Sequence, residues 1–235
     1  LLVDGGATLN IDTDTTVTGG DITTSGASAV VTKSAGTPTV TLGSTGALGG
    51  GTTPTLTFYN LTQNGGTTTV NSDTSVTSTL TVNTGTTVSL ASSKTLTSGT
   101  SGTVTINGTG TISGAGQLTV QNSNLGTGGT LSSIVRFDAT SGDIAMPNRT
   151  YGGLVEVYNN DGSNARVVTM TAGTHTLSGA LNLLAANTQN VTLAGATNNP
   201  TVNVTGDIDF TGAGAGTEVI TSGTATWTGS ANVNF

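Results

Sequence analysis

Residues 102–116 read GTVTINGTGTISGAG, and two other stretches repeat this pattern: PTVTLGSTGALGGG at 38–51 and PTVNVTGDIDFTGAG at 200–214. In each stretch aliphatic residues alternate with Thr or Asn, and small residues rich in glycine follow. Alternation with a period of two, closed by turn residues, predicts a half-buried β-strand followed by a turn. Thr and Val favour strands because β-branching restricts their rotamers and suits the pleated surface of a sheet.

The aliphatic residues of the three stretches are expected to point into a core, with the intervening Thr or Asn pointing outward. These inward residues are Val40, Leu42, Val104, Ile106, Val202 and Val204. Alignment of the three copies also places Leu48, Ile112 and Phe210 at one equivalent position. Similar lead-in segments precede the copies, so we expect a single elongated repeat domain over residues 1–235, with units of roughly 1–53, 54–145 and 146–235.

Composition favours an ordered all-β protein with a thin core: 33% of residues are hydrophobic, 7% are charged, and 36 are glycines. Two architectures fit, a parallel β-solenoid with short strands and Gly/Asn-rich turns, or one or two β-sandwich domains. The solenoid is preferred, because its narrow interior needs few aromatics and the chain has only 4 Phe, 3 Tyr and 1 Trp. A coil would take about 22 residues and set its strands ~4.8 Å from those of the next coil. Residues 179–190, which read GALNLLAANTQN, are the nearest approach to a helical pattern and are interpreted as a strand.

The charge pattern argues against nucleic acid as a partner. The net charge is −7, and the five basic residues are scattered, whereas phosphate binding needs cations gathered on one surface. The chain has no cysteine and no run of about 20 apolar residues, so we expect neither disulfides nor membrane insertion. It opens without a signal peptide, and we expect that it begins after processing or is a piece of a longer chain.

Candidate catalytic and metal-binding residues are sparse, and we expect no enzyme and no cofactor. His175 is the only histidine, and a polar residue on a strand face or in a turn is its preferred interpretation. Asp12 with Asp14, and Asp207 with Asp209, are two residues apart and so share a strand face. Each pair could bind Ca²⁺ or serve as an acid and base, but a solvated strand face is preferred.

The segment YNNDGSN at 158–164 is interpreted as a turn, because it lacks the ligand spacing of a calcium loop. The aromatics are expected mainly to cap or plug coils, with a sugar-stacking platform as the alternative. Five N-x-S/T sequons are candidate glycosylation sites: Asn60, Asn107, Asn148, Asn190 and Asn203.

The stretch TFYNLTQNGGTTTVNSDTSVTSTLTVNTGTTVSL at 57–90, with GTVTINGTGTISGAG after it, resembles the Thr/Gly/Asn-rich β-strand-repeat surface proteins of bacteria and archaea. More distantly, the chain is similar to the solenoid passenger domains of autotransporters and to filamentous-haemagglutinin-type adhesins. The resemblance covers most of the chain, best from about residue 54 onward. It implies an exported, surface-exposed protein with a structural or adhesive function, and it supplies no catalytic residues.

The function expected from these observations is that of a structural subunit of an extracellular filament, sheath or surface layer. A surface adhesin or glycan-binding module is the first alternative, and a polysaccharide lyase or hydrolase is the second. The partner would be the protein itself, in an open filament, with surface glycans as further partners. Both ends of the sequence look strand-like and uncapped, which predicts an assembly interface there. Its residues would be Leu1, Leu2, Val3, Trp227, Val233 and Phe235.

Overall fold

The structure, a computed structural model, describes residues 1–210, 214–229 and 232–234 and shows a parallel β-solenoid without helices in that part of the chain. The preferred prediction of the fold is therefore confirmed, and the β-sandwich alternative is wrong. The chain divides into two compact units. Unit 1 comprises residues 1–118 and 128–133, and unit 2 comprises residues 119–127 and 134–235.

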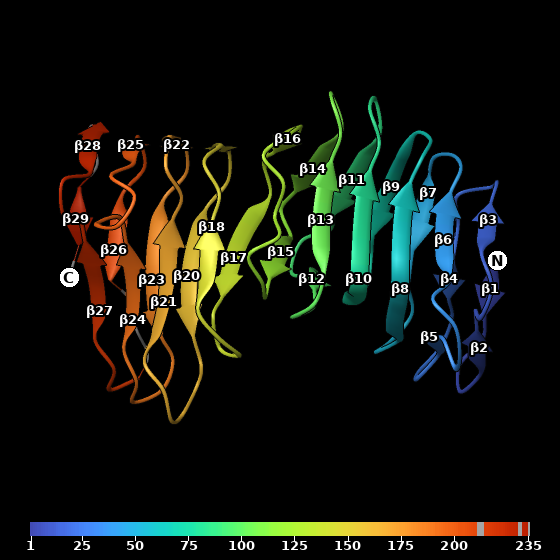
Figure 1. The fold of residues 1–235 in the computed structure, drawn as a ribbon. Coiled ribbons are helices and arrows are strands. Elements are labelled where there is room, and N and C mark those ends of the chain that lie inside the picture. Colours follow the sequence, from blue (N-terminus) through green and yellow to red (C-terminus); the bar gives the residue numbers. More distant parts are fainter. Residues whose placement is uncertain (211–213, 230–231, 235) are drawn as a thin grey trace. The chain divides into compact units, whose positions relative to one another are not determined.

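Each coil of unit 1 contributes strands to three faces (Figure 1). The first face is a row of paired strands in the order β2, β5, β8, β10 and β12. The second face is a row in the order β3, β6, β8, β10 and β13. β7, β9, β11, β14 and β16 form the third face. β8 and β10 are nine residues long and serve the first two faces in turn. The strands are β1 (Leu2–Val3), β2 (Thr8–Asn10), β3 (Thr15–Val17), β4 (Thr23–Thr24), β5 (Val30–Thr32), β6 (Thr39–Leu42), β7 (Gly46–Leu48), β8 (Thr55–Gln63), β9 (Thr67–Val70), β10 (Thr74–Val82), β11 (Thr87–Leu90), β12 (Thr95–Ser98), β13 (Thr103–Ile106), β14 (Thr111–Gly114) and β16 (Thr130–Leu131), while β15 (Gln117–Val120) holds residues of both units.

Unit 2 also has three parallel faces, and each coil visits them in the same order. The faces are β17-β20-β23-β26-β29, β18-β21-β24-β27 and β19-β22-β25-β28. On the first face Val135, Val155, Leu181, Ile208 and Val233 stack, so successive coils differ by 20, 26, 27 and 25 residues. The strands are β17 (Ile134–Asp138), β18 (Ile144–Met146), β19 (Thr150–Tyr151), β20 (Val155–Asn159), β21 (Arg166–Met170), β22 (Thr174–Leu177), β23 (Leu181–Ala185), β24 (Val191–Ala194), β25 (Thr201–Val204), β26 (Ile208–Phe210), β27 (Glu218–Thr221), β28 (Thr226–Gly229) and β29 (Val233–Asn234).

The core lies inside the coils, as the alternating pattern predicts. The six aliphatic residues expected to point inward are each at most 2% exposed, and the Thr or Asn residues between them are half-buried on the outer face. Burial of each such side chain contributes roughly 1.5–3 kcal/mol. The segment 179–190, interpreted as a strand, contains all of β23 and ends directly before β24.

Stacked polar residues and glycines join successive coils at the corners. In unit 1 the Nδ2 of Asn83 donates to Asn64 Oδ1 (2.7 Å), and the Nδ2 of Asn107 donates to Asn83 Oδ1 (3.1 Å). In unit 2 a Cβ added to Gly206 would lie 2.4 Å from the backbone carbon of Gly179. This corner therefore needs glycine because the backbones of adjacent coils approach too closely for a side chain.

The alignment of Leu48, Ile112 and Phe210 is wrong in its register. Leu48 is in line with Val70 and then with Leu90, whereas Ile112 is in line with Val88. Leu48 and Ile112 thus share the third face of unit 1 but occupy positions two residues apart. Phe210 ends β26, which lies on the first face of unit 2.

Candidate functional site

The first coil of unit 1 carries strand edges that pair with nothing else in the described residues. β1 pairs on one side with β4, β2 with β5 and β3 with β6. Leu1 and Leu2 on this coil are 54% and 61% exposed, whereas Val3 is buried at 5%. The backbone N–H and C=O groups of such an edge are a template for a further strand.

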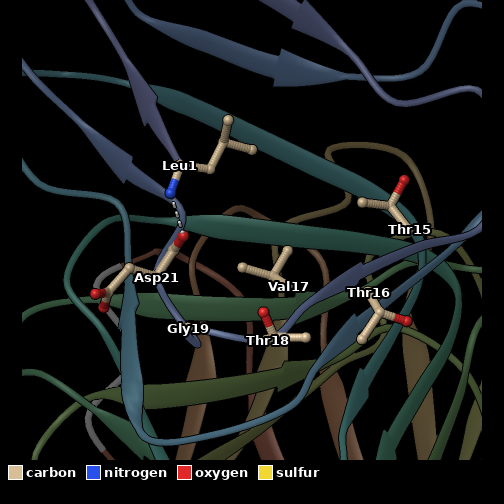
Figure 2. Close-up of a pocket in the computed structure, with 7 residues that line it drawn as sticks. All are labelled: Leu1, Thr15, Thr16, Val17, Thr18, Gly19 and Asp21. Carbon is tan, nitrogen blue, oxygen red and sulfur yellow. Dashed lines mark hydrogen bonds between the residues drawn. The ribbon is translucent and has the colours of Figure 1, made fainter.

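A hollow of about 390 Å³ lies beside this edge and is lined by Leu1, residues 15–19 and Asp21. Figure 2 shows Leu1 and Asp21 on one side of it and Thr15 and Thr16 on the other, with Val17 between them. The N-terminal amine donates to the backbone oxygen of Asp21 over 2.9 Å, which fixes Leu1 against the first turn. The hollow therefore combines apolar side chains with a free strand edge.

The last coil of unit 2 presents the opposite edge. Within the described residues β27 pairs only with β24, β28 only with β25, and β29 only with β26. Val233 is 50% exposed, and Trp227 is half-buried with no hydrogen-bond partner for its Nε1 in the described chain. A hollow of about 160 Å³ there is lined by Val204, Ile208, Trp227, Thr228, Gly229 and Val233. Phe235, also predicted at the interface, lies outside the described residues.

Carboxylates at coil corners accept hydrogen bonds from the backbone of the following coil. Asp14 accepts from the N–H of Thr39 (2.8 Å), Asp73 from that of Thr95 (2.8 Å), and Asp143 from Val167 (2.9 Å). The acceptor always belongs to the earlier coil in these three pairs, so the connection between coils has a direction. Charged acceptors make such bonds roughly twice as strong as neutral ones.

The carboxylates considered for calcium also accept hydrogen bonds from the following coil, from its backbone or its side chains. Asp12 accepts from the N–H and Oγ of Ser34 and from the N–H of Ala35, at 2.6–2.9 Å, and these bonds, led by that of the Ser34 hydroxyl, lower the pKa of Asp12. Asp207 accepts from Asn232 Nδ2 (2.9 Å), and Asp209 accepts from Asn234 Nδ2. Among the described residues no group of three or more His, Cys, Asp or Glu side chains is placed to hold a metal.

The segment at 158–164 forms a turn that its own side chains satisfy. Asp161 accepts from Asn164 Nδ2 (3.0 Å) and from the N–H of Ser163 (2.8 Å), and Arg166 donates to the same carboxylate. These hydrogen bonds, with that of Asn164 the largest contribution, lower the pKa of Asp161 to about 2. The turn interpretation thus fits the structure, and the cation beside the Asp161 carboxylate is the guanidinium of Arg166.

His175 is on a strand face as expected, but on the inner one, where it is completely buried in β22. Arg149 is buried too, at 6% exposed, and its Nη1 donates to Gly126 O (2.5 Å). This inward arginine was not predicted from the sequence. The available signal was its spacing of two from Tyr151, which is buried and donates its hydroxyl to Pro147 O (2.7 Å). Residues two apart on a strand share a face.

The aromatic residues have two environments. Phe58, Phe137 and Tyr151 lie inside the coils, and the rings of Phe137 and Tyr151 meet edge to face at 5.9 Å. Tyr59 and Tyr158 are half-buried on outer faces, each beside a cation: Lys33 lies 4.9 Å from the Tyr59 ring centre, and Arg136 lies 4.3 Å from that of Tyr158. The structure thus offers both core-filling aromatics and two outward rings.

The five sequon asparagines differ in exposure. Asn107, Asn148 and Asn190 are exposed at turns, whereas Asn60 and Asn203 are half-buried within strands. Asn60 Oδ1 accepts from the N–H of Thr79 (3.1 Å), and Asn190 Oδ1 accepts from that of Thr217 (2.8 Å). Asn60 Nδ2, the atom to which a glycan would be attached, donates to Thr37 O and Thr39 Oγ1 over 3.4 Å, so glycosylation at Asn60 would compete with contacts between coils.

Comparison with known proteins gives no relative for this chain: no protein-family model, curated protein or solved structure matches it. The described residues include no helix long and apolar enough to cross a membrane.

Proposed function

We propose that the chain is a structural subunit of an extracellular filament, sheath or surface layer, and that copies join head to tail through their outermost coils. One observation carries the proposal. In the described residues, three large hydrophobic side chains are at least half exposed, and all belong to the first or last coil: Leu1, Leu2 and Val233. Covering them with a further coil would bury apolar surface and pair free strand edges in one step.

The direction of the contacts between coils supports head-to-tail rather than head-to-head joining. Asn232 is the corner residue of the last coil, at the position equivalent to Asp207 in the coil before it. Its N–H and Nδ2 donate hydrogen bonds to the Asp207 carboxylate. Its amide oxygen can accept a backbone N–H of an added coil, as the corner carboxylates do. Head-to-tail contacts of this kind are heterologous and generate open filaments when the rotation does not close. The extracellular setting rests on the resemblance to Thr/Gly/Asn-rich surface proteins.

The test uses two variants, each of which damages one end. Leu2→Lys places a charge on the first coil, and Val233→Lys places one on the last, while Thr105→Lys on an outer face of unit 1 is the control. Light scattering after size-exclusion chromatography and negative-stain electron microscopy measure the size of the assemblies. We expect wild type and the control to form filaments that lengthen with concentration.

Each end variant alone should stay monomeric, and an equimolar mixture of the two should form dimers that do not grow. The mixture has one intact first coil and one intact last coil, which can join only once. Wild-type protein that is monomeric at every concentration, or end variants that polymerise like wild type, would contradict the proposal.

A further inference from the structure

The buried imidazole of His175 has only one of its two nitrogens satisfied. Nε2 lies 2.9 Å from the backbone oxygen of Thr171, which can only accept, so Nε2 carries the proton of the neutral ring. Nδ1 is buried and has no hydrogen-bond partner in the described residues. A protonated ring would carry a second N–H there, and this donor would lack an acceptor.

The neighbouring strands offer nothing that would stabilise a positive charge. On β25 the residue paired with His175 is Val202. On the opposite side of β22 lies β19, and the residue in line with His175 is Arg149, directly before β19. The next inward residue on β19 is Tyr151. Burial raises the pKa of Tyr151, so this phenol stays neutral. No Asp or Glu is among the buried residues described, and the inner faces of β17, β20, β21 and β23 carry Val135, Phe137, Val155, Val157, Val168, Met170, Leu181 and Leu183.

We propose that His175 makes unit 2 an acid-sensitive element, in which protonation of the imidazole opens the coils around β22. A cation in this position would be buried beside apolar side chains, and the charge nearest in its own column would be another cation, Arg149. Burial of an unpaired charge is costly, and the folded unit avoids the cost only while the ring is neutral.

The direction of the pH dependence follows from burial, which lowers the pKa of His175 in the folded protein. Because the folded pKa is lowered, the contribution of the neutral ring to the free energy of unfolding is fully present above the unfolded pKa of about 6.5. It is lost progressively as the pH falls from there to the folded pKa. Across that interval the unfolding equilibrium constant rises by up to about tenfold for each pH unit.

The first measurement needs no variant, because His175 is the only histidine in the chain. Its imidazole gives one set of histidine ring resonances in an NMR titration. We expect the ring to stay neutral in the folded protein below pH 6.5 and to titrate only as the signals of unit 2 broaden or disappear. A ring that titrates at or above pH 6.5 in a protein that remains folded would overturn the proposal.

The second measurement compares wild type with His175→Val, which places in β22 the residue that β25 already holds at this position. Urea denaturation is followed at pH 7.5, 6.5, 5.5 and 5.0, above the range where carboxylates titrate. Wild type should lose stability toward pH 5.0, and the variant should change little. Parallel pH profiles of the two proteins would contradict the role assigned to His175.

Hydrogen exchange locates the opening and provides an internal control. After correction for the intrinsic pH dependence of exchange, protection of β22 and β25 should fall between pH 7.5 and 5.0. Protection of β11 and β13 in unit 1, which contains no histidine, should be unchanged. Equal losses in both units would show that a general acid effect, and not His175, is responsible.

Discussion

The replacement Val104→Asp tests the inward face that the opening stretch of the sequence predicts. Val104 lies in β13 with no exposed surface, and its partner across the coils is Leu80 of β10, which is equally buried. The adjacent Thr105 points outward and is half-buried. The pair Val104→Asp and Thr105→Asp therefore introduces the same side chain one residue apart, on opposite faces of one strand.

The expected magnitude combines two contributions. Loss of a buried valine side chain costs roughly 1.5–3 kcal/mol. An aspartate in its place can avoid an unpaired buried charge by taking up a proton. At pH 7 this costs about 4 kcal/mol, because the ordinary pKa lies about three units below and each unit is worth 1.36 kcal/mol. Val104→Asp should thus lower the free energy of unfolding by about 6 kcal/mol, which is comparable to the total stability of a small domain.

Thr105→Asp should cost about 1 kcal/mol or less, since it changes only strand propensity on an outer face. Urea denaturation followed by far-UV circular dichroism measures both variants at pH 7 and pH 4.5. At pH 4.5 the proton costs little, so the difference between the variants should shrink by several kcal/mol. Equal losses of unfolding free energy at pH 7 would refute the inward assignment of Val104. A difference between the variants that does not change with pH would refute the charge argument.

Two further predictions concern the corners of unit 2. Gly206→Ala should lower the thermal midpoint clearly, because its Cβ would lie 2.4 Å from the backbone of Gly179. The control Gly142→Ala should change the midpoint little, because no atom lies within 4 Å of its added Cβ. Similar midpoints for the two variants would contradict the close-approach argument. For Asp161, a folded pKa of about 2 lies below the unfolded value, so the carboxylate stabilises the fold above about pH 3.9 and this contribution is lost as the pH falls toward 2. Thermal midpoints of Asp161→Asn should therefore depend less on pH than those of wild type between pH 5 and 2, and identical slopes would count against the contact with Asn164.

Much of the fold could be predicted because its determinants are local. Val40 and Leu42, and their equivalents in the other copies, point inward because alternation along a strand is fixed by the backbone itself. The scarcity of aromatic residues also favoured a solenoid, because the narrow interior of a coil has little volume to fill. The chemistry was partly predictable too: the polar turn around Asp161 follows from the preference of Asn, Asp and Gly for turns.

The polar residues of the core are only weakly marked in the pattern. Thr68 and His175 lie on inner faces although both are polar, and Thr69, next in sequence to Thr68, points outward. Each of these strands has a single apolar residue, Val70 in β9 and Leu177 in β22, so only one residue per strand marks the inner face. Which face turns inward is decided by neighbouring coils, because register is a property of the pair of strands.

Short strands with one apolar face are already written into the order of the residues, because side-chain alternation and turn propensity act within a few residues. The stacking of these strands, in contrast, becomes visible only in the folded coils. In the folded coils Leu48 is in line with Val70, and not in the column of Ile112 as the sequence alignment predicts. Successive coils on the first face of unit 2 are 20 to 27 residues apart. The stacking also brings Arg149 and His175, 26 residues apart in the chain, into one column of the core. Turns of variable length separate the strands, so contacts between coils depend on loop lengths that no local pattern records.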